Sequence, residues 1–328
     1  MLLSYDIVDV FTDRAFAGNQ LAVVQGADGL STAQCHALAR EFNFSESTFP
    51  EPGGPAAYSL RIFTPEGEIP FAGHPTLGTA WVLRSHGLLA SAEVVQTCGA
   101  GLIGVRFAGD LVELSAAPRD LAGPVPPDLV GELLADIGLS VEDLAGDVWV
   151  AGCGLSFVHV PVADDAVARA HPASGSFDWS GFGDVSRFGS GPGVVEDLLD
   201  ALNLYAVTGS GAGTGSELDV HARVFVPGAG VPEDPATGSA AAGLGMALVA
   251  RGLLGDGGRY AIRQGVEMGR PSQLLGRVDV ADGRAVRCHV AGQVQHVASG
   301  EIRVPAVSPE VSPGISPRIS PEISPGIS

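Results

Sequence analysis

Alternating apolar and polar side chains near the start of the chain predict β-strands. Residues 5–11 alternate and then pass through a Gly-Asn turn into the apolar run 21–24, a pattern typical of a β-hairpin. Residues 58–63 alternate in the same way and end at a turn that contains proline and glycine. The first part of the chain is therefore predicted to be rich in strands.

Two stretches with helical features interrupt these strands. A short helix is predicted over residues 31–42, with Ser31 as a suitable N-cap and two apolar residues four positions apart. A second helix is predicted from about residue 75 to residue 85, and Gly87 stands where a glycine commonly ends a helix.

This unit of strand, glycine turn and helix occurs twice. Residues 70–89 align without a gap with residues 235–254, 165 positions later. Upstream, residues 61–65 (RIFTP) resemble residues 223–227 (RVFVP). The shared order of features predicts two similar halves. The coinciding pairs are Pro70/Pro235, Gly73/Gly238, Gly78/Gly243, Leu83/Leu248, Gly87/Gly252, Leu88/Leu253 and Leu89/Leu254.

Each half is predicted to wrap a strand-rich, barrel-like sheet around one central helix, which gives an α+β fold. Alanine and glycine in these helices would let the strands approach closely. If the halves pack face to face, the two helix N-termini with their unpaired N–H groups converge on the cleft between them. Two such helix starts predict a pocket for an anion.

The repeat also predicts where the halves begin and end. The first half is expected over residues 1–118 and the second over 119–290, with a proline-rich linker at 115–127. Residues 305–328 repeat a Ser-Pro tetrad that can form neither a helix nor a core, so a disordered tail is expected there.

Charge and hydropathy bear on the partners of the chain. It has 37 acidic and 18 basic residues and a formal net charge of −19, so no nucleic-acid partner is expected. A small anionic substrate remains possible, because helix starts supply positive potential without Lys or Arg. The N-terminus lacks signal-peptide features and no apolar run could span a bilayer, so we expect a soluble, cytoplasmic protein without a membrane partner.

The cysteines do not indicate a metal site. Cys35, Cys98, Cys153 and Cys288 lie far apart and have no CxxC spacing. This pattern favours buried free thiols over a zinc site or a disulfide framework.

Glu46 is the first candidate for chemistry. It lies in the polar and aromatic stretch 43–49, directly after the first predicted helix. A carboxyl group in a closing apolar cleft acquires a raised pKa and can exchange protons near neutral pH, as general acid–base catalysis requires. From the local sequence alone, a solvated surface glutamate is the alternative.

His74 and Ser239 occupy equivalent places at the starts of the two repeated helices, after Gly73 and Gly238. A histidine beside a helix N-terminus tends to stay neutral and could orient or relay a proton, whereas a capping or packing role is the alternative. Ser239 is expected to hydrogen-bond a substrate, because no Gly-x-Ser-x-Gly elbow surrounds it as a nucleophile would require.

Asp234 stands just before the second repeated helix, in the stretch 233–239. It could be a second proton-handling carboxylate that faces Glu46, or it could only cap the turn. Two carboxylates from opposite halves would suit a proton shuttle.

Several segments, in this order, resemble the PhzF-like family of phenazine biosynthesis, whose fold resembles that of diaminopimelate epimerase. They extend along almost the whole chain but leave out the tail. The segments are 9–19, 44–49, 61–65, 68–80, 233–239 and 264–272.

The resemblance implies an isomerase that acts on trans-2,3-dihydro-3-hydroxyanthranilate without a metal or an organic cofactor. It also implies that Glu46 is the acid–base residue. The implied supporting residues are His74, Asp234, Ser239 and, through their backbone N–H groups, Gly73 and Gly238. The segment 264–272 belongs to the resemblance, but its residue types indicate no more than a tight turn.

A homodimer is implied as well, together with a C-terminal strand at about 291–304 that returns to the first half. Related epimerases and racemases use two cysteines at the helix starts, and these are absent here, so two-thiol racemisation is chemically closed to this chain. One departure concerns the first hairpin, where the family usually has Gly-Asn-Pro and this chain has Gly18-Asn19-Gln20. A lost proline could alter the loop near the cleft, which leaves the substrate open.

Two alternatives therefore stand beside the leading hypothesis. The same fold could isomerise another unsaturated, amino-acid-like biosynthetic intermediate. It could also have lost catalysis and serve as a binding protein, although the joint presence of Glu46, His74, Asp234 and Ser239 argues against this.

Overall fold

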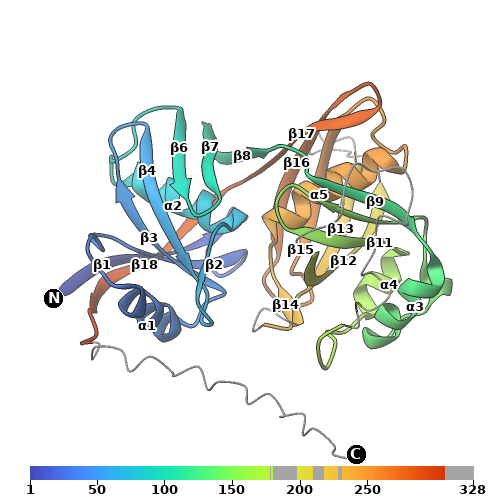
Figure 1. Cartoon of the computed structure of the whole chain (residues 1–328), viewed down its shortest axis with the longest axis horizontal. Coiled ribbons are helices and arrows are strands. Elements are labelled where there is room, and N and C mark those ends of the chain that lie inside the picture. The colour runs from blue at the N-terminus through green and yellow to red at the C-terminus, as the bar shows by residue number, and fades with distance from the viewer. Residues whose placement is uncertain (178, 180–197, 210–217, 228–230, 307–328) are drawn as a thin grey trace, which may run out of the picture.

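Strands surround one central helix in each half of the chain, α2 in the first and α5 in the second (Figure 1). The computed structural model describes residues 1–177, 179, 198–209, 218–227 and 231–306. From residue 307 onward the predicted tail therefore lies outside the described residues.

The elements of the first half are β1 (Leu2–Val10), β2 (Asn19–Val24), α1 (Thr32–Phe42), β3 (Glu46–Pro52), β4 (Ala57–Phe63), β5 (Glu68–Ile69), α2 (Gly73–Ser85), β6 (Glu93–Cys98), β7 (Gly101–Ala108) and β8 (Leu111–Ala116). Those that follow are β9 (Asp120–Val125), α3 (Pro127–Asp136), a 3-10 turn (Val141–Asp143), β10 (Val148–Gly152), β11 (Ser156–Pro161), α4 (Asp164–Arg169), β12 (Leu198–Gly209), β13 (Leu218–Phe225), β14 (Glu233–Asp234), α5 (Gly238–Ala250), β15 (Gly258–Gln264), β16 (Ser272–Ala281), β17 (Arg284–Gly292) and β18 (Val294–Arg303).

The strand pairing repeats between the halves. In the first half β2 runs parallel to β3, and β3 runs antiparallel to β4. In the second half β11, β12 and β13 follow the same order with the same directions. The predicted α+β architecture of two similar strand-rich halves is therefore confirmed.

Glycines in the two central helices allow the strands to pack against them. A Cβ atom on Gly78 would lie 2.6 Å from a methyl carbon of Leu21, and one on Gly243 would lie 2.8 Å from the carbonyl oxygen of Ala151. These two glycines occupy equivalent positions in the repeat, so the close approach of strand to helix is built into both halves.

Two paired strands join the halves. β8 pairs with β7 on one side and with β17 on the other, which makes a hydrogen-bonded bridge between the two groups of strands. After β17 the chain crosses back, and β18 pairs along β1 (Figure 1). The C-terminal strand thus lies in the first half.

The expected linker at 115–127 is wrong. β8 extends to residue 116, and β9 occupies 120–125 and pairs with β10. The register between β9 and β10 shifts beside Pro124, so a local bulge accommodates the residue that has no N–H group for the ladder. A proline-rich segment can therefore still form an irregular strand.

The helix predictions hold with one shift. Ser31 caps α1 in a capping box with Gln34, whose backbone N–H donates to Ser31 Oγ. The second helix begins at Gly73, two residues earlier than expected, because His74 and Pro75 already belong to its first turn. Among the described residues, no helix is long and apolar enough to cross a membrane.

Candidate active site

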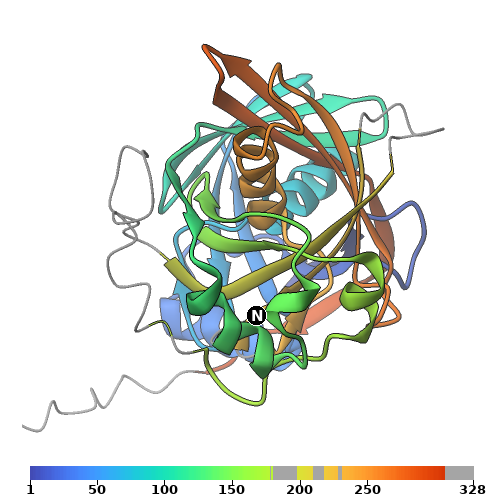
Figure 2. The same ribbon diagram turned by 90° about the vertical axis from the view of Figure 1, so that its right-hand side faces the viewer.

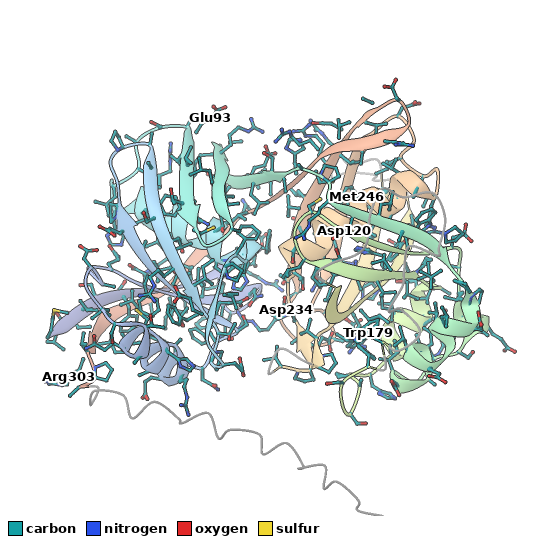
Figure 3. All side chains as sticks on the ribbon, in the orientation of Figure 1. Glu93, Asp120, Trp179, Asp234, Met246 and Arg303 are labelled. Atoms are coloured by element: carbon teal, nitrogen blue, oxygen red, sulfur yellow. The ribbon has the colours of Figure 1, made fainter. Side chains whose placement is uncertain are left out.

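A cavity of about 240 Å³ lies between the halves, and all six residues that the sequence singled out line it. Its walls come from both halves, and Asp234 lies where they face each other (Figure 3). The lining residues are Ser45, Glu46, Thr64, Ile69, Pro70, Phe71, Ala72, Gly73, His74, Leu155, Phe157, Val226, Val231, Asp234, Ala236, Thr237, Gly238 and Ser239.

The starts of α2 and α5 meet at this cavity. A Cβ atom on Gly73 would lie 3.3 Å from the Cα atom of Gly238, so only glycine fits this approach without a shift. Figure 2 shows the two helices next to each other near the centre of the molecule. The convergence of the helix starts, on which the anion pocket depends, is therefore present.

Neither helix start is closed by a side chain. The N-cap residues Ala72 and Thr237 have extended backbones, and no described side chain caps the first turn of α2 or α5. The first N–H groups of a helix have no partner inside the helix and carry its positive end. Since the described lining residues include no Lys or Arg, these N–H groups supply the positive potential for an anion.

Glu46 is the first residue of β3, where it pairs with Leu21 of the parallel strand β2, and it lines the cavity. Its Oε2 atom is buried and has no hydrogen-bond partner among the described residues. Burial raises the pKa of this carboxyl to about 7, against a smaller lowering by its hydrogen bond with Ser45. The carboxyl is thus withdrawn from water and poised to exchange a proton near neutral pH.

His74 lies beside Glu46, with 3.7 Å between its Nδ1 atom and Glu46 Oε2. Its Nε2 atom is 3.3 Å from the carbonyl oxygen of Gln20, which can only accept, so we assign the ring proton to Nε2. Burial lowers the pKa of His74 to about 4, although Asp234 and the Gln20 carbonyl oppose this. The imidazole is therefore neutral and offers Nδ1 as an acceptor.

The contact with Gln20 also bears on the missing proline of the first hairpin. His74 reaches the main-chain oxygen of residue 20 rather than its side chain. A proline at this position would present the same oxygen, so the departure at Gln20 leaves this part of the site intact.

Asp234 stands at the end of β14, and both of its carboxyl oxygens accept hydrogen bonds. Oδ1 accepts from Asn19 Nδ2 at 2.8 Å, and Oδ2 accepts from Thr237 Oγ1 at 2.6 Å. Burial and the charge of Glu46 raise the pKa of Asp234 to about 6, while His74 and the two hydrogen bonds lower it. Both oxygens of Asp234 are thus held by hydrogen bonds, whereas Oε2 of Glu46 has no partner among the described residues.

Asn19 links the halves, and no role was predicted for it from the sequence. Its Nδ2 atom lies 3.4 Å from His74 Nδ1, 2.8 Å from Asp234 Oδ1 and 3.0 Å from the carbonyl oxygen of Ala236. Its Oδ1 atom accepts from Ser45 Oγ at 3.3 Å. In the sequence it stood in the Gly-Asn turn of the predicted hairpin and in the segment 9–19 that resembles the family, and neither indicated a role in the site.

Gln264 holds the turn between Asp234 and Thr237, just before α5. Its Nε2 atom donates to the carbonyl oxygen of Asp234 at 2.8 Å and to Thr237 Oγ1 at 3.0 Å, and its Oε1 atom accepts from the Thr237 N–H. The segment 264–272 therefore has a contact with the site that its residue types did not reveal.

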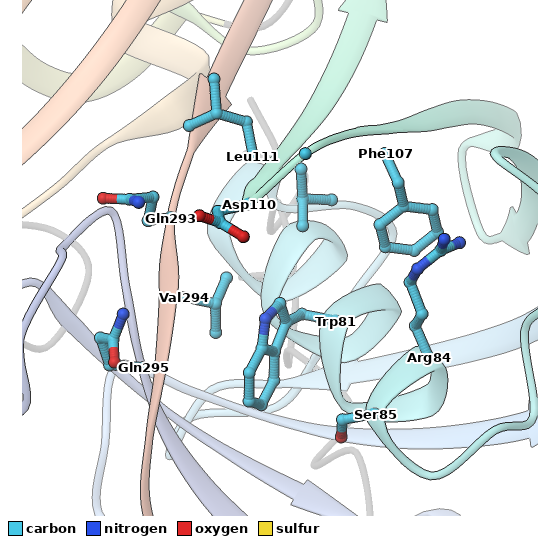
Figure 4. A pocket seen from close by; sticks show the side chains of 11 residues that line it. Trp81, Arg84, Ser85, Phe107, Asp110, Leu111, Gln293, Val294 and Gln295 are labelled. Carbon is cyan, nitrogen blue, oxygen red and sulfur yellow. The ribbon is translucent and has the colours of Figure 1, made fainter.

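Another cavity, of about 330 Å³, lies near the opposite end of α2 (Figure 4). It is lined by Trp81, Arg84, Asp110 and residues of the crossing strand β18, and by none of the six candidates. The first turn of α2 is about 12 Å or more away along the helix. Among the described residues, no group of three or more His, Cys, Asp and Glu side chains could hold a metal ion.

Comparison with known proteins gives one family across the chain. The model of the family described as phenazine biosynthesis-like protein matches residues 8–300. A trans-2,3-dihydro-3-hydroxyanthranilate isomerase of Pseudomonas fluorescens is 35% identical over 294 residues, which cover 88% of this chain and 95% of that protein. An uncharacterized isomerase of Mesorhizobium japonicum is 33% identical over 324 residues, covering 91% and 98%.

Solved structures agree on the fold. A phenazine biosynthesis protein of the PhzF family from Bacillus anthracis matches with a TM-score of 0.77 at 23% identity, covering 93% of this chain and all of that one. A hydroxyproline epimerase from Agrobacterium vitis matches with a TM-score of 0.56 at 15% identity, covering 92% of each chain. At these identities both similarities concern the fold alone.

Proposed function

Since the chain belongs to the phenazine biosynthesis-like protein family and is an isomerase, we propose that it moves a proton between two carbons of a small anionic substrate without a metal or organic cofactor. The substrate we propose is trans-2,3-dihydro-3-hydroxyanthranilate, on which the relative from Pseudomonas fluorescens is named to act, or a close analogue.

One observation carries this proposal: Glu46 Oε2 is buried without a partner beside a neutral histidine, in a cavity that two open helix starts share. A buried carboxylate oxygen without a hydrogen-bond partner costs stability, and such a cost is typical of catalytic groups. A binding protein that had lost catalysis would gain stability by replacing it.

In the proposed reaction Glu46 takes a proton from an acidic C–H bond of the substrate. The electron pair of that bond enters the conjugated system, and the helix starts at Gly73 and Gly238 stabilise the negative charge that develops. The protonated carboxyl then returns the proton to another carbon, so the atoms and charges of enzyme and substrate balance. His74, through its Nδ1 atom, can accept a hydrogen bond from the Glu46 hydroxyl between the two steps.

The asymmetry of the site supports a single proton carrier. β3 pairs with Phe63 and β12 pairs with Phe225, and these two phenylalanines are equivalent in the repeat. When the two strands are aligned on them, the buried Ala201 of the second half is the counterpart of Glu46. A two-base racemase needs an acid–base group on each face of the substrate. With one unpartnered carboxyl, we expect removal and return of the proton on the same face.

The walls of the cavity support a flat, partly unsaturated ring as the body of the substrate. Phe71, Phe157 and several aliphatic side chains form them, while the helix starts provide N–H groups for a carboxylate. We assign Asp234 a supporting role, because its oxygens already accept hydrogen bonds from Asn19 and Thr237.

A labelled substrate tests the proposal. With deuterium at the carbon that loses its hydrogen, we expect the label to leave that carbon and to reappear in part at the receiving carbon, on the same face. Proton and deuterium NMR of the product would measure both positions. Label that stays at the original carbon, or hydrogen that arrives from the opposite face, would contradict proton transfer by Glu46.

The pH dependence follows from the state of Glu46. We expect kcat/KM to rise with pH and to reach a plateau above about pH 7, because the base must be ionised and its pKa is about 7. His74, with a pKa of about 4, stays neutral over this range and adds no further limb. Initial rates from pH 5 to pH 9 would check this, and a rate that falls as pH rises through 7 would show that the protonated form is the active one.

A further inference from the structure

The segment 264–272 contacts three separate parts of the molecule. Gln264 holds the turn before α5, as described above. The carboxyl of Glu267 lies 3.0 Å from His221 Nε2 in the second half. Arg270 instead extends across the boundary to the first half. Its side chain is long and carries several N–H donors, a combination that no other residue of this segment has.

Arg270 binds the loop between β1 and β2 through several donors. Its Nε atom donates to the carbonyl oxygen of Gly18 at 2.8 Å, and Nη2 donates to that of Ala17 at 2.8 Å and to Asp9 Oδ1 at 2.5 Å. The Gly18 N–H donates in return to the carbonyl oxygen of Pro271 at 3.2 Å. The Asp9 carboxylate is almost fully buried, so this charged pair is shielded from water.

The loop leaves little freedom for the residue that follows it. Gly18 has a φ of +68°, and a Cβ atom there would lie 2.3 Å from the carbonyl oxygen of Val10. Asn19 comes next and places one amide nitrogen within hydrogen-bond distance of both His74 and Asp234. The position of that amide therefore depends on how the loop is held.

We propose that Arg270 is a positioning residue of the isomerase site, which acts through Asp9 and the backbone of residues 17–18 to hold Asn19 between His74 and Asp234. The inference deepens the proposed function and rests on it. Arg270 does not line the cavity, so its effect must pass through Asn19.

A double-variant comparison tests this coupling. Arg270→Met and Asn19→Ala should each lower kcat by about 100-fold, because a displacement of about 1 Å in a catalytic arrangement has an effect of that size. The double variant should be no more than about threefold slower than Asn19→Ala, since both changes remove the same contact. Losses that multiply to about 10⁴-fold would overturn the proposal.

A conservative variant and a matched control separate positioning from general stability. Arg270→Lys keeps a charge near Asp9 but cannot donate in the same fork, so we expect it to lose only about tenfold and to fold even if Arg270→Met does not. Arg106→Met removes a guanidinium that pairs with Glu113 at 2.9 Å and does not line the cavity, and should leave kcat within about twofold. Equal losses in Arg106→Met and Arg270→Met would overturn the proposal.

A spectroscopic readout decides the question without any turnover. Nitrogen-15 NMR of the histidine side chains, with His74 assigned by its loss in His74→Gln, should show the proton on Nε2 in the natural protein. In Arg270→Met the balance between the two tautomers should shift, because the Asn19 amide would no longer be held 3.4 Å from Nδ1. An unchanged tautomer would overturn the role of Arg270, whereas failure of the proposed function would appear separately, as activity that survives Glu46→Gln.

Discussion

Glu46→Gln is expected to lower kcat by about 1,000-fold while leaving the fold and substrate binding largely intact. Glutamine has nearly the same size and fits the same place at the start of β3, but its amide cannot carry a proton between carbons. General acid–base catalysis by one group contributes about 10²- to 10⁴-fold, which sets the size of the loss. Rates with trans-2,3-dihydro-3-hydroxyanthranilate, and calorimetric binding of the same compound to the variant, would measure both effects.

The strand itself provides the control. Glu51 lies on β3 as well but is exposed, so Glu51→Gln changes the same chemical group outside the cavity. We expect its kcat to stay within about twofold of the natural protein. If Glu46→Gln kept near-normal activity on a compound that the natural protein converts, proton transfer by Glu46 would be wrong.

The sequence predicted the architecture well because the repeat depends on glycines at fixed positions. Gly73 and Gly238 are needed where the helix starts touch, and Gly78 and Gly243 are needed where strands press on the helices. Each requirement is a matter of space for a Cβ atom, so it acts on residue type at a fixed position. A pattern of this kind can be seen in a single sequence.

The hydrogen-bond network of the site could not be predicted in the same way. Asn19 contacts His74 and Asp234, which are 55 and 215 residues away along the chain. Gln264 and Arg270 likewise act on turns that only the tertiary structure brings near. Local spacing carries no information on such contacts, so Asn19 was assigned to a hairpin and the segment 264–272 to a turn.

The network also supports the different roles that we propose for the two carboxyl groups. Asp234 accepts hydrogen bonds on both oxygens, whereas Glu46 keeps Oε2 without a partner. From the sequence, Asp234 could be a second proton-handling carboxylate that faces Glu46, or it could only cap the turn before the helix. The contacts favour one mobile proton on Glu46 and one fixed acceptor, Asp234, that holds the loop between the halves.

The burial of Glu46 should also be visible in the free energy of unfolding, which should increase in Glu46→Gln by an amount that depends on pH. In the folded protein the pKa of Glu46 is about 7, above its usual value of 4.5. The folded state therefore binds the carboxyl proton of Glu46 more tightly than the unfolded state does. The contribution of this protonated carboxyl to the free energy of unfolding is complete below about pH 4.5 and is lost as pH rises through 7. Glutamine has no such dependence.

The expected difference can be estimated from the pKa values. A shift from 4.5 to about 7 corresponds to about 3 kcal/mol at pH 8, and to less than about 1 kcal/mol at pH 5. The Glu46 side chain is only 16% exposed, so water screens little of this cost. Urea unfolding of the natural protein and of Glu46→Gln at both pH values would measure the two differences.

Glu51→Gln again serves as the reference, because an exposed side chain should leave the free energy of unfolding unchanged at both pH values. A gain in Glu46→Gln that is equally large at pH 5 and pH 8 would point to packing rather than to ionisation. No gain at pH 8 would mean that the carboxylate finds hydrogen-bond partners in solution. The pKa of Glu46 would then not be raised, and its role as a base near neutral pH would be wrong. A gain confined to high pH, together with a loss of turnover, would identify the same carboxyl as both the cost to the fold and the source of the chemistry.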